Sequence, residues 1–533
     1  MTKSHLAAFL TLVFILSVLR ECTASERNCL QIVRYMYHSL GLRTRGIENS
    51  NLAGEWTSSS CEVRPGPQFF TRHITIFRNG TWEGYFYRYN DSQCSEPKLS
   101  LHVRGYLKLS LDPVKDTNKA HFNFTRVNVY PHNEHEQQQI VNVSNRHCPN
   151  SLRVFRSLRS GIHVFEVNLR AFRKRACRNS FGISESEFSK LKLETRRRKG
   201  SKYDKLYFAE IPTIRVTRHK PKSYQLPLQR YNANNCTICR KIQSGTGVRP
   251  PKLPQVPPLK VDLEGEWAST TCETTSGGAF QTRHFKFNKE AKKWECHYFF
   301  YHDAACKDLE AIIQFKGRFK GGISSKKVAG AYDYVFTMTQ ATITPTLSFV
   351  TELLNSAQKD SCGKVRWKTN VAQNITPTFG CAQYGISLPD TEYDLVKMEK
   401  NPEGKKLLYV GQRASDGTQP SSPSRRPTSF YLPLVECSSY KSVKFVPPTT
   451  RPTTRLTTRA ARPFPTLREK PLTTRRRTDR ETIGKATSKK NEQIVENITK
   501  KPGDIELAYR SSAINWSLCN LLIILFIFNF VIA

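Results

Sequence analysis

The middle of this chain contains an internal sequence repeat of two copies. The run Gly54-Glu55-Trp56, followed by Cys61-Glu62, returns about 200 residues later as Gly265-Glu266-Trp267, followed by Cys272-Glu273. Further positions of the first copy recur in the second: Thr71 to His73 as Thr282 to His284, Trp82-Glu83 as Trp294-Glu295, Tyr89 as Tyr301, Asp91 as Asp303, Cys94 as Cys306 and Gly105 as Gly317. A repeat of this length is too long for a solenoid unit and suits a whole domain, so the chain carries two copies of one fold.

The sequence pattern of both repeats predicts β-strands. Apolar and polar residues alternate from Leu99 to Leu111, and the alternation returns in phase from Ile313 to Phe319, which is the period of a strand with one buried face. The same reasoning predicts strands over Phe70 to Arg78, Thr81 to Tyr89, Tyr332 to Met338, Lys205 to Phe208 and Lys406 to Tyr409. Short helices are predicted around Glu134 to Val143 and around Thr346 to Ala357.

A long antiparallel meander must pair with a second sheet or close on itself, and closure removes its edges. Both copies begin with Gly-X-Trp, as lipocalin barrels do, with Trp56 and Trp267 as plugs of one barrel end. The predicted fold is therefore mainly β, with two tandem antiparallel β-barrel-like, lipocalin-reminiscent domains, short helices, disulfide bonds and a disordered stalk after them.

A barrel of about eight strands is just wide enough to hold one elongated apolar ligand. The candidate pocket residues are those on the buried, apolar faces of the strands. The alternative to a ligand-binding role is that these side chains simply fill the barrel interior. They are Leu101, Val103, Leu107 and Leu109 in the first domain, and Ile313, Phe315 and Phe319 in the second.

Composition shifts divide the chain into seven parts. These are a signal peptide (1–24), an N-terminal helical segment (25–49), the first barrel domain (50–240), a Pro-rich linker (241–261), the second barrel domain (262–438), a basic Thr/Pro/Arg stalk (439–510) and a C-terminal membrane-anchor signal (511–533). Within the N-terminal segment, apolar residues from Cys29 to Leu40 fall at helical spacing.

The two ends of the chain predict secretion and tethering. An apolar run from Leu6 to Leu19 before a small-residue cleavage site is typical of a signal peptide. Small residues and an apolar tail up to Ala533 resemble a glycosylphosphatidylinositol signal, with attachment at Ser511 or Ser512; a simple membrane-spanning tail is the alternative. Either anchor places the protein on the extracellular face of the cell membrane.

Thirteen cysteines lie between Cys29 and Cys437, and an oxidising compartment favours disulfides over metal ligation. Ten are predicted to form disulfides because their positions recur: Cys61, Cys94, Cys148, Cys177 and Cys236 (or Cys239) in the first copy, and Cys272, Cys306, Cys362, Cys381 and Cys437 in the second. Connectivity should be largely the same in both copies. Cys29 and Cys296 have no partner by repetition, and the odd total leaves one thiol free or paired with another chain.

Asn-X-Ser/Thr sequons predict N-glycosylation, and five of the seven fall in the first copy. The acceptors are Asn79, Asn90, Asn123, Asn142, Asn235, Asn374 and Asn497.

The net charge of +39 would otherwise suggest a nucleic-acid partner, but an extracellular location excludes that class. Much of the charge lies in the stalk, whose composition cannot bury a core. Clusters such as Arg196 to Lys199 predict attraction to heparan sulfate or to an anionic membrane; an ordinary solvated loop is the alternative.

Histidines that recur beside arginines, His73 after Arg72 and His284 after Arg283, raise the question of catalysis. No Gly-X-Ser-X-Gly, His-Glu-X-X-His or phosphate-binding loop accompanies them. We therefore interpret each Arg-His pair as a sheet-surface pair, and expect a protein that is not an enzyme and needs no cofactor or metal.

The run from Cys61 to Arg72, with Cys-Glu-Val-Arg-Pro-Gly-Pro at its start, resembles the adenomatosis-polyposis-coli-down-regulated family, whose members are membrane-tethered antagonists of Wnt signalling. The recurring Gly-Glu-Trp and cysteine pattern extends the resemblance over residues 50 to 438. The second copy departs from the motif, with Thr274 to Gly278 in place of Val63 to Pro67, which questions whether both domains share one task.

The resemblance implies two adjoining barrels with an apolar pocket that takes an acyl chain. It also implies inhibition of the pathway at the cell surface by contact with Wnt ligands or their co-receptors. We thus expect a negative regulator of Wnt signalling that binds Wnt, its acyl lipid or its receptors. The alternative is an extracellular lipid-binding or heparan-sulfate-binding surface glycoprotein without Wnt specificity.

Overall fold

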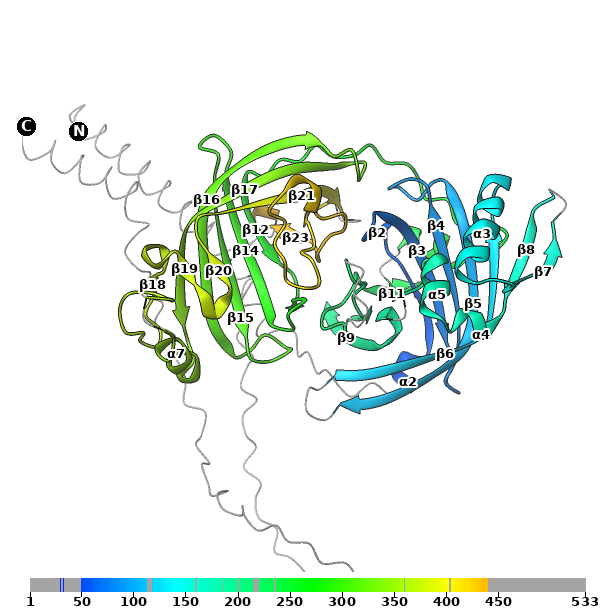
Figure 1. The fold of residues 1–533 in the computed structure, drawn as a ribbon, viewed down its shortest axis with the longest axis horizontal. Coiled ribbons are helices and arrows are strands. Elements are labelled where there is room, and N and C mark those ends of the chain that lie inside the picture. The colour runs from blue at the N-terminus through cyan, green and yellow to red at the C-terminus, as the bar shows by residue number, and fades with distance from the viewer. Residues whose placement is uncertain are drawn as a thin grey trace, which may run out of the picture. The chain divides into compact units, whose positions relative to one another are not determined.

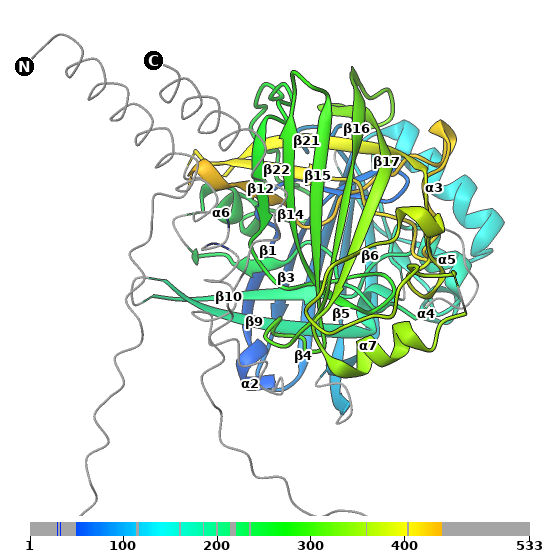
Figure 2. The ribbon, with the colours of Figure 1, turned by 90° about the vertical axis from the view of Figure 1, so that its left-hand side faces the viewer.

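The computed structural model describes residues 29, 32 and 49–439, apart from 113–116, 159–160, 185, 199–200, 214–219, 234–235, 359 and 402–403. This part of the chain is mainly β and forms two closed, eight-stranded antiparallel barrels, one for each copy of the repeat (Figures 1 and 2). The predicted fold class of two tandem barrels is confirmed. The signal peptide, most of the N-terminal helical segment, the stalk and the anchor signal lie outside the described residues.

The first barrel is built from β1 (Gly54–Thr57), β3 (Gln68–Ile76), β4 (Thr81–Tyr89), β5 (Pro97–Asp112), β6 (Thr117–Pro131), β9 (Lys190–Arg198), β10 (Ser201–Phe208) and β11 (Leu228–Arg230). Around the ring the order is β5-β4-β3-β1-β11-β10-β9-β6, and pairing of β5 with β6 closes it. Strand β2 (Glu62–Arg64) pairs with β3, and the hairpin of β7 (Leu152–Ser157) and β8 (His163–Val167) pairs with β6.

The second barrel repeats this ring with β12 (Gly265–Ser269), β14 (Phe280–Asn288), β15 (Lys293–Tyr301), β16 (Leu309–Ser324), β17 (Ala331–Pro345), β21 (Asp390–Lys400), β22 (Lys406–Val410) and β23 (Leu434–Glu436). Pairing of β12 with β14 closes it, and β13 (Glu273–Thr274) pairs with β14 as β2 does with β3. Short strands β18 (Gln373–Asn374), β19 (Gly380–Cys381) and β20 (Ile386–Ser387) lie in the connection between β17 and β21.

The helices are short. They are α2 (Asn49–Leu52), α3 (Glu134–His147), α4 (Leu169–Phe172), α5 (Arg175–Ser180), α6 (Thr237–Gln243) and α7 (Ser348–Asn355), with 3₁₀ turns η1 (Ser186–Phe188), η3 (Thr376–Thr378), η4 (Ala382–Tyr384), η5 (Pro423–Arg425) and η6 (Cys437–Ser439). Helix α3 begins where Asn133 accepts a hydrogen bond from the backbone N–H of Glu136, which is an N-cap. Helices α3 and α7 confirm the two short helices predicted around residues 134–143 and 346–357.

The predicted strands are present. Strand β4 has the predicted bounds, β3 begins two residues earlier than predicted, and the predicted strand from Tyr332 lies inside the longer β17. Strand β21 was not predicted, because carboxylates rather than apolar residues alternate along its first half.

The Gly-Glu-Trp motif opens the first strand of each barrel and has a separate role for each residue. Trp56 is fully buried and its indole N–H donates to the carbonyl of Leu52 at 2.8 Å. The Arg230 guanidinium stacks on the Trp56 ring at 4.0 Å. Gly54 and Gly265 both have a positive φ, of 124° and 96°, a backbone conformation that favours glycine.

The recurring glycine in the middle of each long strand marks a bulge. Register shifts occur beside Gly105 and Gly317, which is the signature of an extra residue in one strand. A Cβ at Gly105 would overlap the carbonyl oxygen of Asn123, and one at Gly317 would overlap that of Thr337. The two barrels are therefore bent at the same point.

Six disulfides join twelve of the thirteen cysteines, and all ten predicted positions are among them. Four bonds follow the repeat, which confirms that part of the predicted connectivity: Cys61–Cys94 with Cys272–Cys306, and Cys148–Cys177 with Cys362–Cys381.

The remaining cysteines correct the prediction. Cys236 pairs with its neighbour Cys239, whereas Cys437 pairs with Cys29, so the last pair of repeated positions is not equivalent. Repetition could not reveal a partner that lies outside the repeated region. Cys296 is the free thiol and is buried.

Candidate functional site

The interior of the second barrel contains a cavity of about 320 Å³. This volume lies at the lower end of the range of roughly 300 to 1,000 Å³ that is typical of small-molecule sites. Its wall comes from most strands of the ring, from the β13–β14 turn, from residues 384–387 and from the segment Gly411–Gln419.

Most of the cavity wall is apolar. Its larger apolar side chains are Phe285, Phe287, Trp294, Tyr298, Phe300, Ile313, Phe315, Phe336, Met338, Val396, Leu408 and Val410. The aromatic rings pack on one another at the wall, with centroids of Tyr298 and Phe315 6.0 Å apart and those of Trp294 and Phe336 5.4 Å apart. These contacts fix the aromatic side chains of the wall relative to one another.

One region of the wall is charged. Asp390, Glu392 and Asp394 alternate along β21 and all line the cavity. Glu392 forms an ion pair with Arg413, which also lines the cavity. Arg283 also reaches the cavity and is held by two hydrogen bonds to Glu273, at 2.8 and 3.1 Å.

Burial changes the ionisation of this region. It raises the pKa of Asp394 to about 7, an effect to which the neighbouring Glu392 carboxylate adds, while two backbone N–H groups, of Leu395 and Gly411, oppose it. Burial likewise raises the pKa of the Tyr298 and Tyr431 hydroxyls, so both stay neutral hydrogen-bonding groups at the cavity surface.

The recurring arginine belongs to a buried triad that both barrels share. In the second barrel Ser269 donates to Glu273 at 2.7 Å, and the backbone N–H of Arg283 donates to the Ser269 hydroxyl at 2.8 Å. In the first barrel Ser58, Glu62 and Arg72 make the same contacts. Arg72 is fully buried and Arg283 is 2% exposed, so the predicted sheet-surface position of the arginines is wrong.

The histidines beside these arginines point to the other face of the strand. His73 hydrogen bonds to Glu55 at 3.1 Å and His284 to Glu266 at 3.2 Å, which explains why the glutamate of Gly-Glu-Trp recurs as well. Each histidine thus has a partner that orients it within the sheet.

The first barrel has the same ring but a different interior. Phe188, from the 3₁₀ turn η1, packs with its ring centroid 5.2 to 5.9 Å from those of five aromatic side chains. These are Trp82, Phe86, Phe122, Phe124 and Phe208. Its neighbour Glu187 is fully buried and binds both Arg64 and Arg72. The turn therefore fills space that the second barrel leaves as a cavity.

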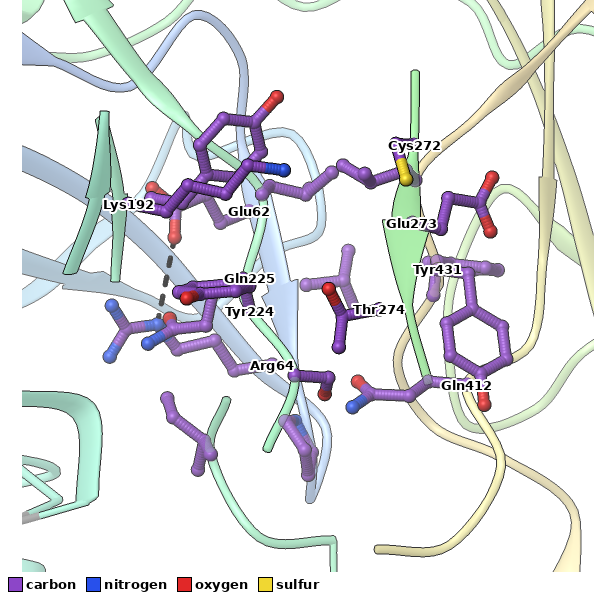
Figure 3. A pocket seen from close by; sticks show the side chains of 18 residues that line it. Glu62, Arg64, Lys192, Tyr224, Gln225, Cys272, Glu273, Thr274, Gln412 and Tyr431 are labelled. Atoms are coloured by element: carbon purple, nitrogen blue, oxygen red, sulfur yellow. Dashed lines mark ion pairs between the residues drawn. The ribbon is translucent and has the colours of Figure 1, made fainter. Parts of the chain in front are cut away.

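A smaller cavity, of about 50 Å³, is lined by residues of both repeats (Figure 3). Glu62 and Arg64 form an ion pair on one side of it, and Cys272 to Thr274 lie on the other. Its volume is too small for an acyl chain.

The structure places the predicted pocket residues in three different settings. Ile313 and Phe315 line the second-barrel cavity. Phe319 instead packs beside it against the rings of Phe287 and Phe336. The four residues of the first barrel, Leu101, Val103, Leu107 and Leu109, belong to or pack on its hydrophobic core.

Sequence reasoning missed the charged part of the cavity. Asp390, Glu392, Asp394 and Arg413 were not singled out, although the spacing of two between the three carboxylates is that of one strand face. The signal was present but was not expected inside a barrel.

One group of four residues has the spacing of a metal site. Ligand atoms of Cys29, Glu266, His284 and Cys437 lie within 4.8 Å of one another. The two sulfurs are joined as a disulfide, so neither is the thiolate that binds metal ions. This group does not fit a metal.

Five of the predicted glycan acceptors are exposed, as attachment requires: Asn79, Asn90, Asn123, Asn142 and Asn374. Asn235 and Asn497, like Ser511 and Ser512, lie outside the described residues. In the part of the chain that the structure describes, no helix is both long and apolar enough to cross a membrane.

A known protein family matches this chain twice. Residues 28–254 and again residues 255–443 match the family described as Adenomatosis polyposis coli down-regulated 1. Together the two stretches cover more than half of the chain and coincide with the two copies of the repeat. The resemblance carried by the run from Cys61 to Arg72 is confirmed.

Proposed function

We propose, from the premise that this chain belongs to the Adenomatosis polyposis coli down-regulated 1 family, that it is a negative regulator of Wnt signalling at the cell surface. In this proposal it acts without catalysis, by binding the acyl chain of a Wnt ligand in the second barrel. The observation that carries the proposal is the apolar cavity of about 320 Å³ in that barrel.

The energetics favour an acyl ligand. Each CH₂ group removed from water contributes about 0.8 kcal/mol, so a buried chain of about a dozen methylenes would gain about 10 kcal/mol before the costs of association. Those costs are about 4 to 15 kcal/mol for lost freedom and ordering, and a preformed rigid cavity keeps the ordering part small. Acyl burial would then supply most of a useful affinity.

The second barrel is the proposed container because the first is filled. Phe188 and Glu187 occupy the interior of the first barrel, whereas the equivalent stretch of the second runs as strand β21 along the cavity wall. The departure of the second copy from the Cys-Glu-Val-Arg-Pro-Gly-Pro motif also fits a division of tasks between the barrels.

Catalysis is not part of the proposal. His73 and His284 each contact a glutamate of their own sheet, and burial lowers the pKa of His73, a direction opposed by Glu55. These contacts support a role in orienting strands.

The proposal is tested by filling the cavity. Ile313→Trp adds bulk to the cavity wall, while Arg318→Trp adds the same side chain to an exposed position of the same strand. The full chain should bind acylated Wnt, and Ile313→Trp should weaken that binding about ten-fold or more, equivalent to about 1.4 kcal/mol. Arg318→Trp should bind as the wild type does.

The readouts are direct binding of acylated and enzymatically deacylated Wnt, and a Wnt-responsive reporter in cells that display each variant. Equal binding of the two Wnt forms would contradict the acyl part of the proposal. Binding that salt or soluble heparin abolishes for both forms would favour heparan-sulfate recognition instead.

A further inference from the structure

The charges that line the second-barrel cavity do not balance. Arg283 is neutralised by Glu273, and Arg413 by Glu392. Asp390 and Asp394 then remain, and among the described residues neither has an ion-pair partner. One carboxylate oxygen of Asp390 is buried without any hydrogen-bond partner in the described structure. Above the pKa of Asp394, which is about 7, the cavity therefore carries an excess of negative charge at its polar region.

This polar region lies beside a wall segment that reaches the surface, although Glu392 and Asp394 themselves are buried. Arg413 belongs to the wall segment Gly411–Gln419, whose Gly417 is exposed, and Gly411 donates its backbone N–H to Asp394. The deeper wall contains buried side chains such as Trp294 and Leu408. A chain that enters with its apolar end first would leave its head group near Arg413 and the three carboxylates of β21.

The head group distinguishes classes of acyl lipid. In an ester or amide it is uncharged and offers a carbonyl oxygen, to which the Arg413 guanidinium at the cavity wall can donate. In a free fatty acid it is a carboxylate at neutral pH, since its pKa is close to the value of about 4.3 of a glutamate side chain. Like charges at short range in a low-dielectric site repel each other more strongly than they do in water.

We infer that the second barrel selects acyl chains with an uncharged, ester- or amide-linked head over free fatty acids, and that Asp390 and Asp394 determine this selectivity. The inference rests on the proposed acyl-binding function and extends it. It would keep the cavity available for a protein-attached acyl chain in a fluid that contains free fatty acids.

The test compares two probes of equal chain length, palmitoleic acid and its methyl ester, with the purified full chain at pH 8. Their affinities are measured by displacement of a fluorescent acyl ester from the cavity. The wild type should bind the ester at least about ten-fold more tightly than the acid, which corresponds to about 1.4 kcal/mol.

The variants identify the residues. In Asp390→Asn/Asp394→Asn the preference for the ester over the acid should fall about ten-fold, because the affinity for the acid rises. Asp308→Asn is the matched control, because it removes an exposed carboxylate of the same barrel, and it should change neither affinity. If the double variant does not fold, as judged by its melting curve, Asp390→Asn alone should give the same direction.

The outcomes separate the two claims. Equal affinity of the wild type for acid and ester, or a preference that the aspartate variants leave unchanged, would overturn the selectivity but leave acyl binding in place. Failure of both probes to bind would overturn acyl binding and the selectivity together.

Discussion

At the scale of single residues, the recurring arginines are buried, which the sequence patterns did not predict. The recurring Arg-His pairs were interpreted as surface features because arginine is rarely buried without a partner. The partner was in the same motif: Glu62 and Glu273 recur with their arginines, ten residues before them, and bind them inside the barrel. Recurrence of a glutamate together with an arginine is thus the signal that identifies a buried pair here.

The inward carboxylate Asp394 makes the stability of the second barrel depend on pH. Its pKa is raised to about 7 in the folded state, against about 3.9 for an exposed aspartate, so the folded state binds the proton more tightly. Between about pH 4 and pH 7 this group therefore lowers the free energy of unfolding as pH rises.

Asp394→Asn removes that dependence, because an amide does not titrate and still accepts from the backbone N–H groups of Leu395 and Gly411. We take the free energy of unfolding of the variant minus that of the wild type. This difference should be larger at pH 8 than at pH 5 by about 1 kcal/mol or more, since each pKa unit corresponds to about 1.4 kcal/mol. Urea unfolding at both pH values measures the difference. A difference that stays constant with pH would contradict the assignment.

At the scale of elements, the two barrels differ in one short stretch. With their registers aligned on Gly105 and Gly317, Glu187 occupies the position of Glu392. In the second barrel this stretch continues as β21, and its carboxylates alternate into the cavity. In the first barrel the 3₁₀ turn η1 breaks the alternation, so Glu187 and Phe188 both face inward.

This difference predicts that Phe188 keeps the first barrel closed to ligands. Phe188→Ala should destabilise the protein by about 3 to 5 kcal/mol, the usual cost of deleting a buried ring. The vacated space is lined by aromatic rings, so it should stay dry and bind a small apolar molecule such as benzene. Denaturant unfolding and benzene binding by NMR measure the two effects.

Phe379→Ala is the matched control, because Phe379 is 76% exposed and its loss should change stability by less than about 0.5 kcal/mol. Loss of stability without benzene binding would mean that the first barrel collapses around the missing ring, contrary to the prediction.

The same stretch shows what sequence could predict of the fold and the site. Local alternation predicted the strands with apolar faces, and with them Ile313 and Phe315 of the cavity wall. It did not identify β21, because the residues that alternate along its first half are carboxylates, which were not expected inside a barrel. The wall segment that contributes Arg413 has no such alternation, and its position depends on contacts with distant strands. The 3₁₀ turn that fills the first barrel has no periodic signal at all.

At the scale of the whole molecule, the duplication predicted the architecture and a disulfide connectivity shared by the two copies, which four of the six bonds follow. What it could not predict is the bond between Cys29 and Cys437, which joins residues 408 positions apart in the chain. Cys29 belongs to the stretch matched to the first repeat and Cys437 to the second. The two copies are therefore covalently linked at a second point, in addition to the Pro-rich linker between them.

This second link predicts how the protein behaves when its linker is cut. A protease site inserted after Val256, which is 65% exposed in the linker, should be cleaved without disturbing either barrel. The two halves should then migrate together in a denaturing gel without reductant and separate after reduction. In the variant Cys29→Ser/Cys437→Ser, which leaves no unpaired thiol at this bond, the two halves should separate without reductant. The control Cys236→Ser/Cys239→Ser removes a bond within the first copy, and its two halves should stay joined. Separation of the cleaved wild-type halves before reduction would contradict the link, since no other disulfide of the described residues crosses the linker.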